Sequence, residues 1–238
     1  MTLLLSLRLE LRKILHQRGT YAGPAVLLVI VGLFVWALWR YGPERSLSRQ
    51  FDRDMIIGGK LVTGSTTARN VMEPCLLVLV PLLVAAVAGG LVAGEARSGL
   101  LRTWLCRPIG RWTVLTAKFL AGWLHAAGLT ACLGLMALGL GYAFFGGGDL
   151  VDFRSGDGLV ILTETQALAR LALAYAIAAL LMAAVASLAL LASTVFENPL
   201  VAAAVAVAFL PASSILGALP YFEFLKPYLL TTHLDVWR

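Results

Sequence analysis

The sequence predicts an all-α integral membrane protein, and three observations carry this prediction. Hydrophobic residues make up 60% of the 238 residues and charged residues only 13%, whereas soluble domains carry about 25% charged residues. The mean hydropathy is high, at +0.86. The apolar residues gather in five long runs, and the charged residues lie mostly between them. A helix that spans a bilayer needs about 20 apolar residues, so we expect five transmembrane helices.

The N-terminal segment, residues 2–18, carries leucines with two competing periods. One set alternates with polar residues as in a strand, and another falls on one face of a helix. Leucine, arginine, glutamate and lysine are good helix formers, so we predict a helix within residues 1–20. It should lie along the membrane interface with its basic residues facing water: Arg8, Arg12, Lys13 and Arg18. The alternative is an ordinary helix that continues into the first span.

The five apolar runs predict spans over residues 21–39, 74–93, 113–145, 166–193 and 200–219. Three polar segments between the spans are predicted to be loops or turns: residues 42–73, 146–165 and 194–198. Pro211 divides the last run, and the piece before it covers only about 18 Å at 1.5 Å per residue. Either Pro211 kinks one full span, which we favour, or two half-helices enter the membrane and return.

The loop over residues 42–73 contains a Gly-Gly-Lys run at residues 58–60, which invites comparison with a phosphate-binding loop. The full motif needs a glycine five residues before Gly59 and a serine or threonine directly after Lys60. Asp54 and Leu61 stand at those two positions. We therefore expect no nucleotide site in this chain.

Composition and cysteine spacing exclude other classes of function. The net charge of +6 comes from a few clusters, which in membrane proteins mark cytoplasmic loops and contacts with anionic lipid rather than nucleic-acid binding. Cys75, Cys106 and Cys132 have no C-x-x-C spacing, so they predict neither a disulfide framework nor a metal site. We expect them to be small buried hydrophobic residues.

Residues 94–118 form a charged island between two apolar runs. Arg97, Arg102, Arg107 and Arg111 recur at intervals of five, five and four residues, and Glu95 opens the segment. Each charge at the centre of a membrane helix costs about 2.5–3.5 kcal/mol, so five cost on the order of 12 kcal/mol, and the island must lie outside the hydrocarbon. The count of basic residues does not settle the orientation, but their density favours a cytoplasmic N-terminus and a cytoplasmic island.

The island matches a family motif in register at Glu95, Gly99, Leu101, Arg102, Leu105, Pro108, Ile109, Arg111 and Lys118. It departs from the motif at Leu100, where threonine is usual, and at Gly110, where serine is usual. In this motif the chain resembles the permease subunit of an ATP-binding-cassette (ABC) transporter, of the type-2, exporter-like membrane class. The N-terminal run L-R-x-E-L-R-K is similar to the interfacial helix of that family.

The resemblance implies a single permease domain over residues 1–238, with a cytoplasmic coupling helix over residues 94–112 between the second and third spans. That helix would dock on an ATPase subunit. The residues that the resemblance places at this contact are Glu95, Gly99, Leu101, Arg102, Leu105, Arg107, Pro108 and Arg111. The family usually has six spans and this sequence indicates five. Either a last helix is missing after Arg238, which we favour, or this is a shorter variant with its C-terminus outside.

The resemblance also implies the partners and the location. We expect two copies of an ABC ATPase subunit, a second permease copy in a homodimer, and the lipid bilayer, but no nucleic acid. ATP and Mg²⁺ would bind to the ATPase, so this chain would hold no cofactor and would not itself be an enzyme. It would be a multi-pass protein of the inner (plasma) membrane with a cytoplasmic N-terminus, exporting its substrate by alternating access.

Three other interpretations are open. The island's arginines could anchor an ordinary loop to lipid headgroups. The chain could be a secondary transporter or channel, although its spans are nearly free of charge and show no internal repeat. It could be an intramembrane enzyme using His125, Glu73 or Glu197, but no carboxylate pair or catalytic motif accompanies them, and a hydrogen-bonded packing role suits His125 better. The apolar spans favour a lipid-like or amphipathic substrate.

Overall fold

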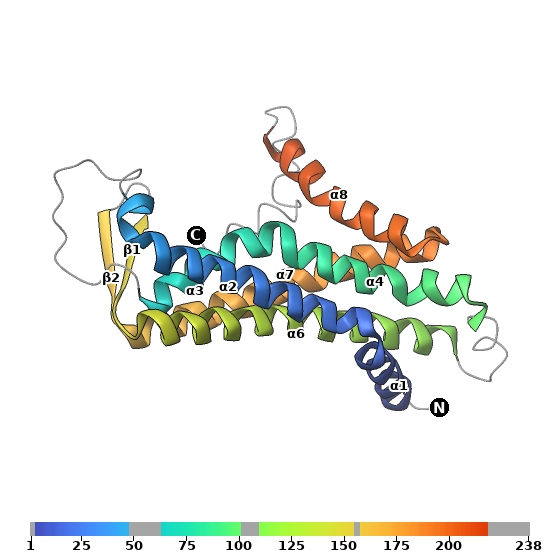
Figure 1. The fold of residues 1–238 in the computed structure, drawn as a ribbon. Coiled ribbons are helices and arrows are strands. Elements are labelled where there is room, and N and C mark those ends of the chain that lie inside the picture. The colour runs from blue at the N-terminus through green and yellow to red at the C-terminus, as the bar shows by residue number, and fades with distance from the viewer. Residues whose placement is uncertain (1–2, 48–62, 101–109, 155–157, 219–238) are drawn as a thin grey trace. The chain divides into compact units, whose positions relative to one another are not determined.

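The computed structural model describes residues 3–47, 63–100, 110–154 and 158–218, and these residues are almost entirely helical (Figure 1). The chain divides into two compact units. The first comprises Met1–Gly23, Leu76–Thr130 and Ala176–Arg238, and the second comprises Pro24–Cys75 and Ala131–Tyr175. Three long helices therefore contribute residues to both units.

The secondary structure follows the chain in a simple order. The helices are α1 (Leu3–His16), α2 (Arg18–Leu47), α3 (Gly64–Pro74), α4 (Val80–Arg97), α6 (Arg111–Phe145), α7 (Glu164–Val195) and α8 (Pro199–Ala218). A π-helical segment, Cys75–Leu79, joins α3 to α4. Strands β1 (Leu150–Arg154) and β2 (Gly158–Leu162) form an antiparallel pair between α6 and α7.

The predicted class, an all-α integral membrane protein, is confirmed. Within the described residues, four helical stretches are long and apolar enough to cross a membrane: Gly19–Tyr41, Gly64–Arg97, Arg111–Phe145 and Glu164–Val195. A fifth apolar helix, α8, is shorter in its described apolar part. It runs through Pro211 as one helix, so the alternative of two half-helices is wrong. Its 20 residues span about 30 Å, close to the thickness of the hydrocarbon core.

The N-terminal helix is confirmed as a separate element. Gln17 is not helical, and it separates α1 from α2, so the two do not form one continuous helix. The hydroxyl of Thr20 donates a hydrogen bond to the Ile14 carbonyl at 2.6 Å, which satisfies a carbonyl at the end of α1. Figure 1 shows α1 turning away from the first residues of α2 at this corner.

The loop predicted over residues 42–73 is wrong at both of its ends. Helix α2 continues to Leu47, and α3 already begins at Gly64; the segment between them, residues 48–62, lies outside the described residues. The hydroxyl of Thr63 accepts a hydrogen bond from Thr66 N at 3.3 Å and so caps the start of α3. The N–H of Gly64 donates to the Gly146 carbonyl at 3.0 Å.

The loop predicted over residues 146–165 contains a short β-hairpin. Leu150 lies opposite Leu162 and Asp152 opposite Val160 in its register. Leu150 and Leu162 are buried with Ala167 of α7 in a small apolar cluster. Hydropathy averaged over the length of a span did not resolve two strands of five residues each.

The first unit has a core in which α1, α4, α6 and α7 meet. Ile14, Leu91, Ala121 and Leu190 form a buried cluster, one residue from each helix. Gly122 lets α6 approach closely, since a Cβ there would lie 3.4 Å from Leu91 Cδ1. Helix α8 packs along α4, and a Cβ on Gly89 would lie 3.0 Å from the backbone nitrogen of Ala203. This unit therefore holds α1 against the C-terminal half of α4 and the N-terminal half of α6.

The second unit is held by contacts of glycine with aromatic rings. Gly64 at the start of α3 packs against Tyr142 of α6, and Gly134 of α6 packs against the ring of Tyr175 of α7. The Tyr175 hydroxyl donates to the carbonyl of Ala68 at 3.1 Å, and the Tyr142 hydroxyl donates to Glu164 Oε1 at 2.9 Å. The hydroxyl groups of both tyrosines thus have a hydrogen-bond partner.

Candidate functional site

Four charged side chains from three helices meet in the first unit, at the two ends of the charged island. Glu10 and Lys13 come from α1, Glu95 from the last turn of α4, and Lys118 from the second turn of α6. Lys13 and Glu95 form one ion pair, Lys118 and Glu10 form another, and Lys118 and Glu95 form a third. We name these four residues the ion cluster.

Lys118 occupies the centre of the ion cluster. Its Nζ atom lies 2.8 Å from Glu10 Oε1, 2.7 Å from Glu95 Oε2 and 2.9 Å from the carbonyl oxygen of Leu91. An ammonium group carries three N–H donors and no acceptor. Three oxygens therefore surround Lys118, and they come from two other helices. Those of Glu10 and Leu91 accept hydrogen bonds, whereas Glu95 Oε2 contacts the ammonium group as an ion pair.

Three residues of the ion cluster are deeply buried, Lys13 is partly exposed, and the four together are electrically balanced. Lys118 is 1% exposed, Glu95 3% and Glu10 4%. Burying an unpaired charge costs several kcal/mol, whereas two acids beside two bases leave no net charge. Apolar side chains of similar volume often stabilise a protein at least as well as a buried ion pair does, so the burial of these charges is by itself weak evidence for stability.

The two carboxylates of the ion cluster are not held equally. Glu95 pairs with both Lys13 and Lys118, whereas Glu10 pairs with Lys118 alone within the described residues. The second oxygen of Glu10, Oε2, is buried without a hydrogen-bond partner in that part of the chain. So is the hydroxyl of Ser6, one turn earlier on α1. Lys118 is thus the polar contact that the buried face of α1 depends on.

An apolar layer lies one helical turn from the ion cluster. Glu10 is four residues from Ile14 on α1, Glu95 four residues from Leu91 on α4, and Lys118 three residues from Ala121 on α6. Residues three or four apart lie on the same face of a helix. The buried face of each helix therefore presents one charged and one apolar layer to the other two.

The structure describes three of the eight residues predicted to contact an ATPase. Glu95 is buried in the ion cluster, Gly99 lies in the turn after α4, and Arg111 is exposed at the first residue of α6. Gly99 has φ of 75°, a left-handed conformation that favours glycine and ends the helix. The other five lie outside the described residues: Leu101, Arg102, Leu105, Arg107 and Pro108. The ATPase contact stays a prediction for all eight residues. Because Glu95 is buried, it would not touch the ATPase itself and would act through its ion pairs to α1 and α6.

Sequence reasoning missed the ion cluster. It placed Lys13 on a basic face in water; the side chain is 34% exposed, but it also pairs with Glu95, a contact that sequence reasoning did not predict. It noted Lys118 as a motif position without giving it a partner. The available signal was the lone acid of the N-terminal segment, Glu10, together with opposite charges at the two ends of the island.

The residues considered for an intramembrane enzyme do not form a site. His125 lies within α6, and its buried Nε2 has no hydrogen-bond partner in the described part of the chain, so the hydrogen bond expected there is absent. Glu73 lies near the end of α3, and Glu197 lies in the turn between α7 and α8. Among the described residues no group of three His, Cys, Asp or Glu side chains could hold a metal ion.

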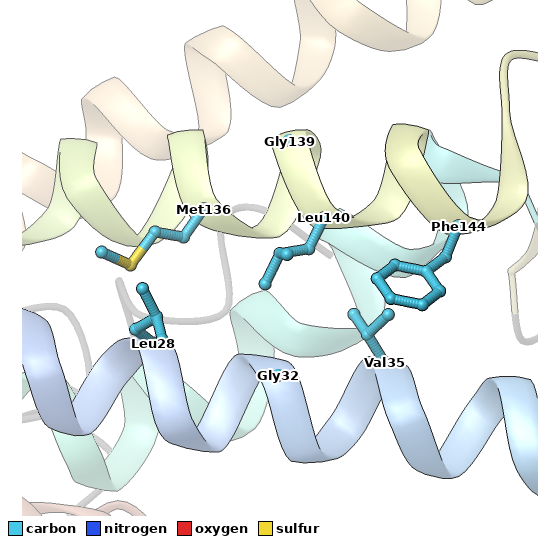
Figure 2. Close-up of a pocket in the computed structure, with 7 residues that line it drawn as sticks. All are labelled: Leu28, Gly32, Val35, Met136, Gly139, Leu140 and Phe144. Carbon is cyan, nitrogen blue, oxygen red and sulfur yellow. The ribbon is translucent and has the colours of Figure 1, made fainter.

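A separate apolar groove lies in the second unit, between α2 and α6. Its volume is about 450 Å³. It is lined by Leu28, Gly32, Val35, Met136, Gly139, Leu140 and Phe144 (Figure 2). Gly32 and Gly139 leave room between the two helices, while Leu140 and Phe144 point towards α2 (Figure 2). The lining offers van der Waals contact and no polar side chain.

The comparisons with known proteins agree with the motif. A family model described as ABC-2 family transporter protein matches residues 5–233 of the chain. The match spans nearly the whole sequence, including both compact units and the ion cluster. A comparison with curated proteins gives no match.

Proposed function

Because the chain belongs to the ABC-2 family of transporter proteins and is a permease subunit of an ABC transporter, we propose that it exports its substrate by alternating access driven by a separate ATPase. The family membership carries this proposal. The chain is a multi-pass membrane protein. We place it in the inner (plasma) membrane with α1 and the island on the cytoplasmic side.

We propose that the ATPase docks on residues 98–111, with Arg102, Arg107 and Arg111 binding carboxylates of the partner. Arginine suits this role because its planar fork can bind a carboxylate with two parallel hydrogen bonds. The ends of the segment support the proposal. Glu95 at the end of α4 and Lys118 near the start of α6 are joined by an ion pair of 2.7 Å, so a push on the segment reaches both helices.

The remaining parts of the complex follow from the same proposal. ATP and Mg²⁺ bind to the ATPase, and this chain contributes no catalytic residue and no cofactor site. Two permease copies and two ATPase copies form the working unit. A homodimer is the simplest assembly, because one chain then supplies both halves of the transport pathway.

Co-purification tests the proposal. The chain is expressed with an affinity tag together with the ATPase encoded beside its gene, purified, and placed in liposomes for measurement of ATP hydrolysis. We expect the ATPase to co-purify and its hydrolysis rate to exceed that of the ATPase alone. Membranes with the ATPase but without this chain are the control. A chain that retains no ATPase and responds to an ion gradient instead would be a secondary transporter.

Transport direction needs a ligand. A screen for lipid-like and amphipathic compounds that stimulate hydrolysis by the complex provides one. An exporter then accumulates that compound inside inverted vesicles when ATP is added outside. Depletion from the vesicle interior would contradict export while leaving the permease assignment intact.

A further inference from the structure

The ion cluster joins its three helices pairwise. Lys13 and Glu95 join α1 to α4, Glu10 and Lys118 join α1 to α6, and Glu95 and Lys118 join α4 to α6. Each helix is therefore tied to both of the others by a charged contact. Two of these three ties use Lys118, which also binds the backbone of α4 at the Leu91 carbonyl.

Other contacts around the ion cluster also hold α1 against its neighbouring helices. Ile14 of α1 packs with Leu91 and Ala121 one turn away. Thr20 fixes the last turn of α1 to the start of α2. On the other side of α4, the Ser193 hydroxyl of α7 accepts hydrogen bonds from Val92 N and Ala93 N at 3.2 and 2.8 Å. α1 thus packs against the C-terminal part of α4, around Leu91 and Glu95, from which the chain continues into the island.

We propose that Lys118 is a positioning residue that locks α1 to the ends of α4 and α6, so that α1 moves as one body with them when the segment between them is displaced. The source of the displacement rests on the proposed function. The lock itself does not, because its contacts lie within this chain.

The chemistry of the cluster distinguishes a lock from ordinary packing. Apolar side chains of similar volume could fill the same space with equal or better stability, but they would tolerate small shifts of the helices. An ammonium group held by two hydrogen bonds and an ion pair from two other helices tolerates few arrangements. Glu10 has no second partner in the described residues, so α1 loses its tie to α6 when Lys118 is replaced.

Distance measurement by pulsed electron paramagnetic resonance tests the lock. Spin labels are placed on cysteines at two exposed positions, Arg12 on α1 and Leu115 on α6, so that they report the contact made by Glu10 and Lys118. Cys75, Cys106 and Cys132 are first replaced by alanine. The permease is measured alone and in complex with its ATPase, with and without ATP. We expect one narrow distance distribution that does not change with nucleotide, and a broadened distribution in Lys118→Met.

Two variants separate the lock from a loss of stability. Glu10→Gln combined with Lys118→Met removes one charge of each sign and leaves Glu95 paired with Lys13, so it should fold even if Lys118→Met alone does not. We expect its thermal stability to return towards that of the native protein while the distance distribution stays broad. Lys13→Met, which leaves both Lys118 contacts in place, is the matched control and should keep the narrow distribution.

The results distinguish failure of the Lys118 lock from failure of the proposed function. A narrow distribution in the double variant would overturn the lock, whatever its stability. An equally broad distribution in Lys13→Met would show that Lys118 has no special role. If no ATPase binds, the proposed function fails, but the distances in the permease alone still decide whether Lys118 locks α1.

Discussion

Lys118 shows at the scale of single residues how much depends on one buried charge. Its two carboxylate partners lie 108 residues before it on α1 and 23 residues before it on α4. The sequence marked Glu95 and Lys118 as motif positions, yet charge and spacing could not pair them with each other or with Glu10. Which residues of distant helices meet depends on packing, and packing leaves no periodic signal in one sequence.

Replacing Lys118 should lower stability through the partners it leaves behind. Lys118→Met keeps the side-chain volume but leaves Glu10 buried and unpaired, and breaking a buried pair from one side costs about 3–5 kcal/mol. Adding Glu10→Gln should recover most of that loss. The thermal midpoint of the purified protein in detergent measures both effects. A Lys118→Met protein as stable as the native one would contradict the charge balance described for the ion cluster.

At the scale of elements, hydropathy predicted the long helices and missed the polar ones. The spans predicted at 113–145, 166–193 and 200–219 agree with α6, α7 and α8 to within two residues at each end. Helix α3 was missed because its sequence, GSTTARNVMEP, is polar and begins with glycine. Its start depends on the Thr63 cap and on close packing of Gly64 against Tyr142. Tertiary contacts of this kind override weak local preference.

The close approach of α3 to α6 predicts unequal effects at two glycines of α6. A Cβ on Gly141 would lie 2.8 Å from the Gly64 carbonyl oxygen, whereas a Cβ on Gly128 would meet no atom within 4 Å. Gly141→Ala should therefore destabilise the protein by about 1–3 kcal/mol, as overpacking does. Gly128→Ala, the matched control, should be neutral or gain up to about 1 kcal/mol of helix propensity. Equal thermal midpoints for the two variants would argue against this packing.

At the scale of the whole molecule, the order of the apolar helices determines which connecting segments share a side of the membrane in the proposed topology. If α1 lies in the cytoplasm, so do the turn after α4 and the turn between α7 and α8, while the end of α6 lies outside. In this order the turn between α7 and α8, residues 196–198, is cytoplasmic and contains no basic residue. The positive-inside rule alone therefore gave a weak answer, because basic residues also occur in residues 42–73.

Cysteine labelling tests this topology. Single cysteines at Arg12, Ser98 and Glu197 should react with a membrane-impermeant maleimide in inverted vesicles, and a cysteine at Asp149 should react in right-side-out vesicles. All four positions are exposed, so a failure to react reports the side of the membrane rather than burial in the protein. The reverse pattern would place α1 and the island outside and would exclude a cytoplasmic ATPase as the partner of residues 98–111.

The central claim is that ATP-driven motion enters this permease through the island. The most direct measurement is the stimulated ATP hydrolysis of the reconstituted complex carrying Arg102→Glu. The control is Arg40→Glu, near the C-terminal end of α2, which makes the same charge change outside the island. We predict that Arg102→Glu abolishes stimulation while the protein still inserts in the membrane, and that Arg40→Glu retains it. Unchanged hydrolysis in Arg102→Glu would contradict the assignment of the island as the site where the ATPase drives transport.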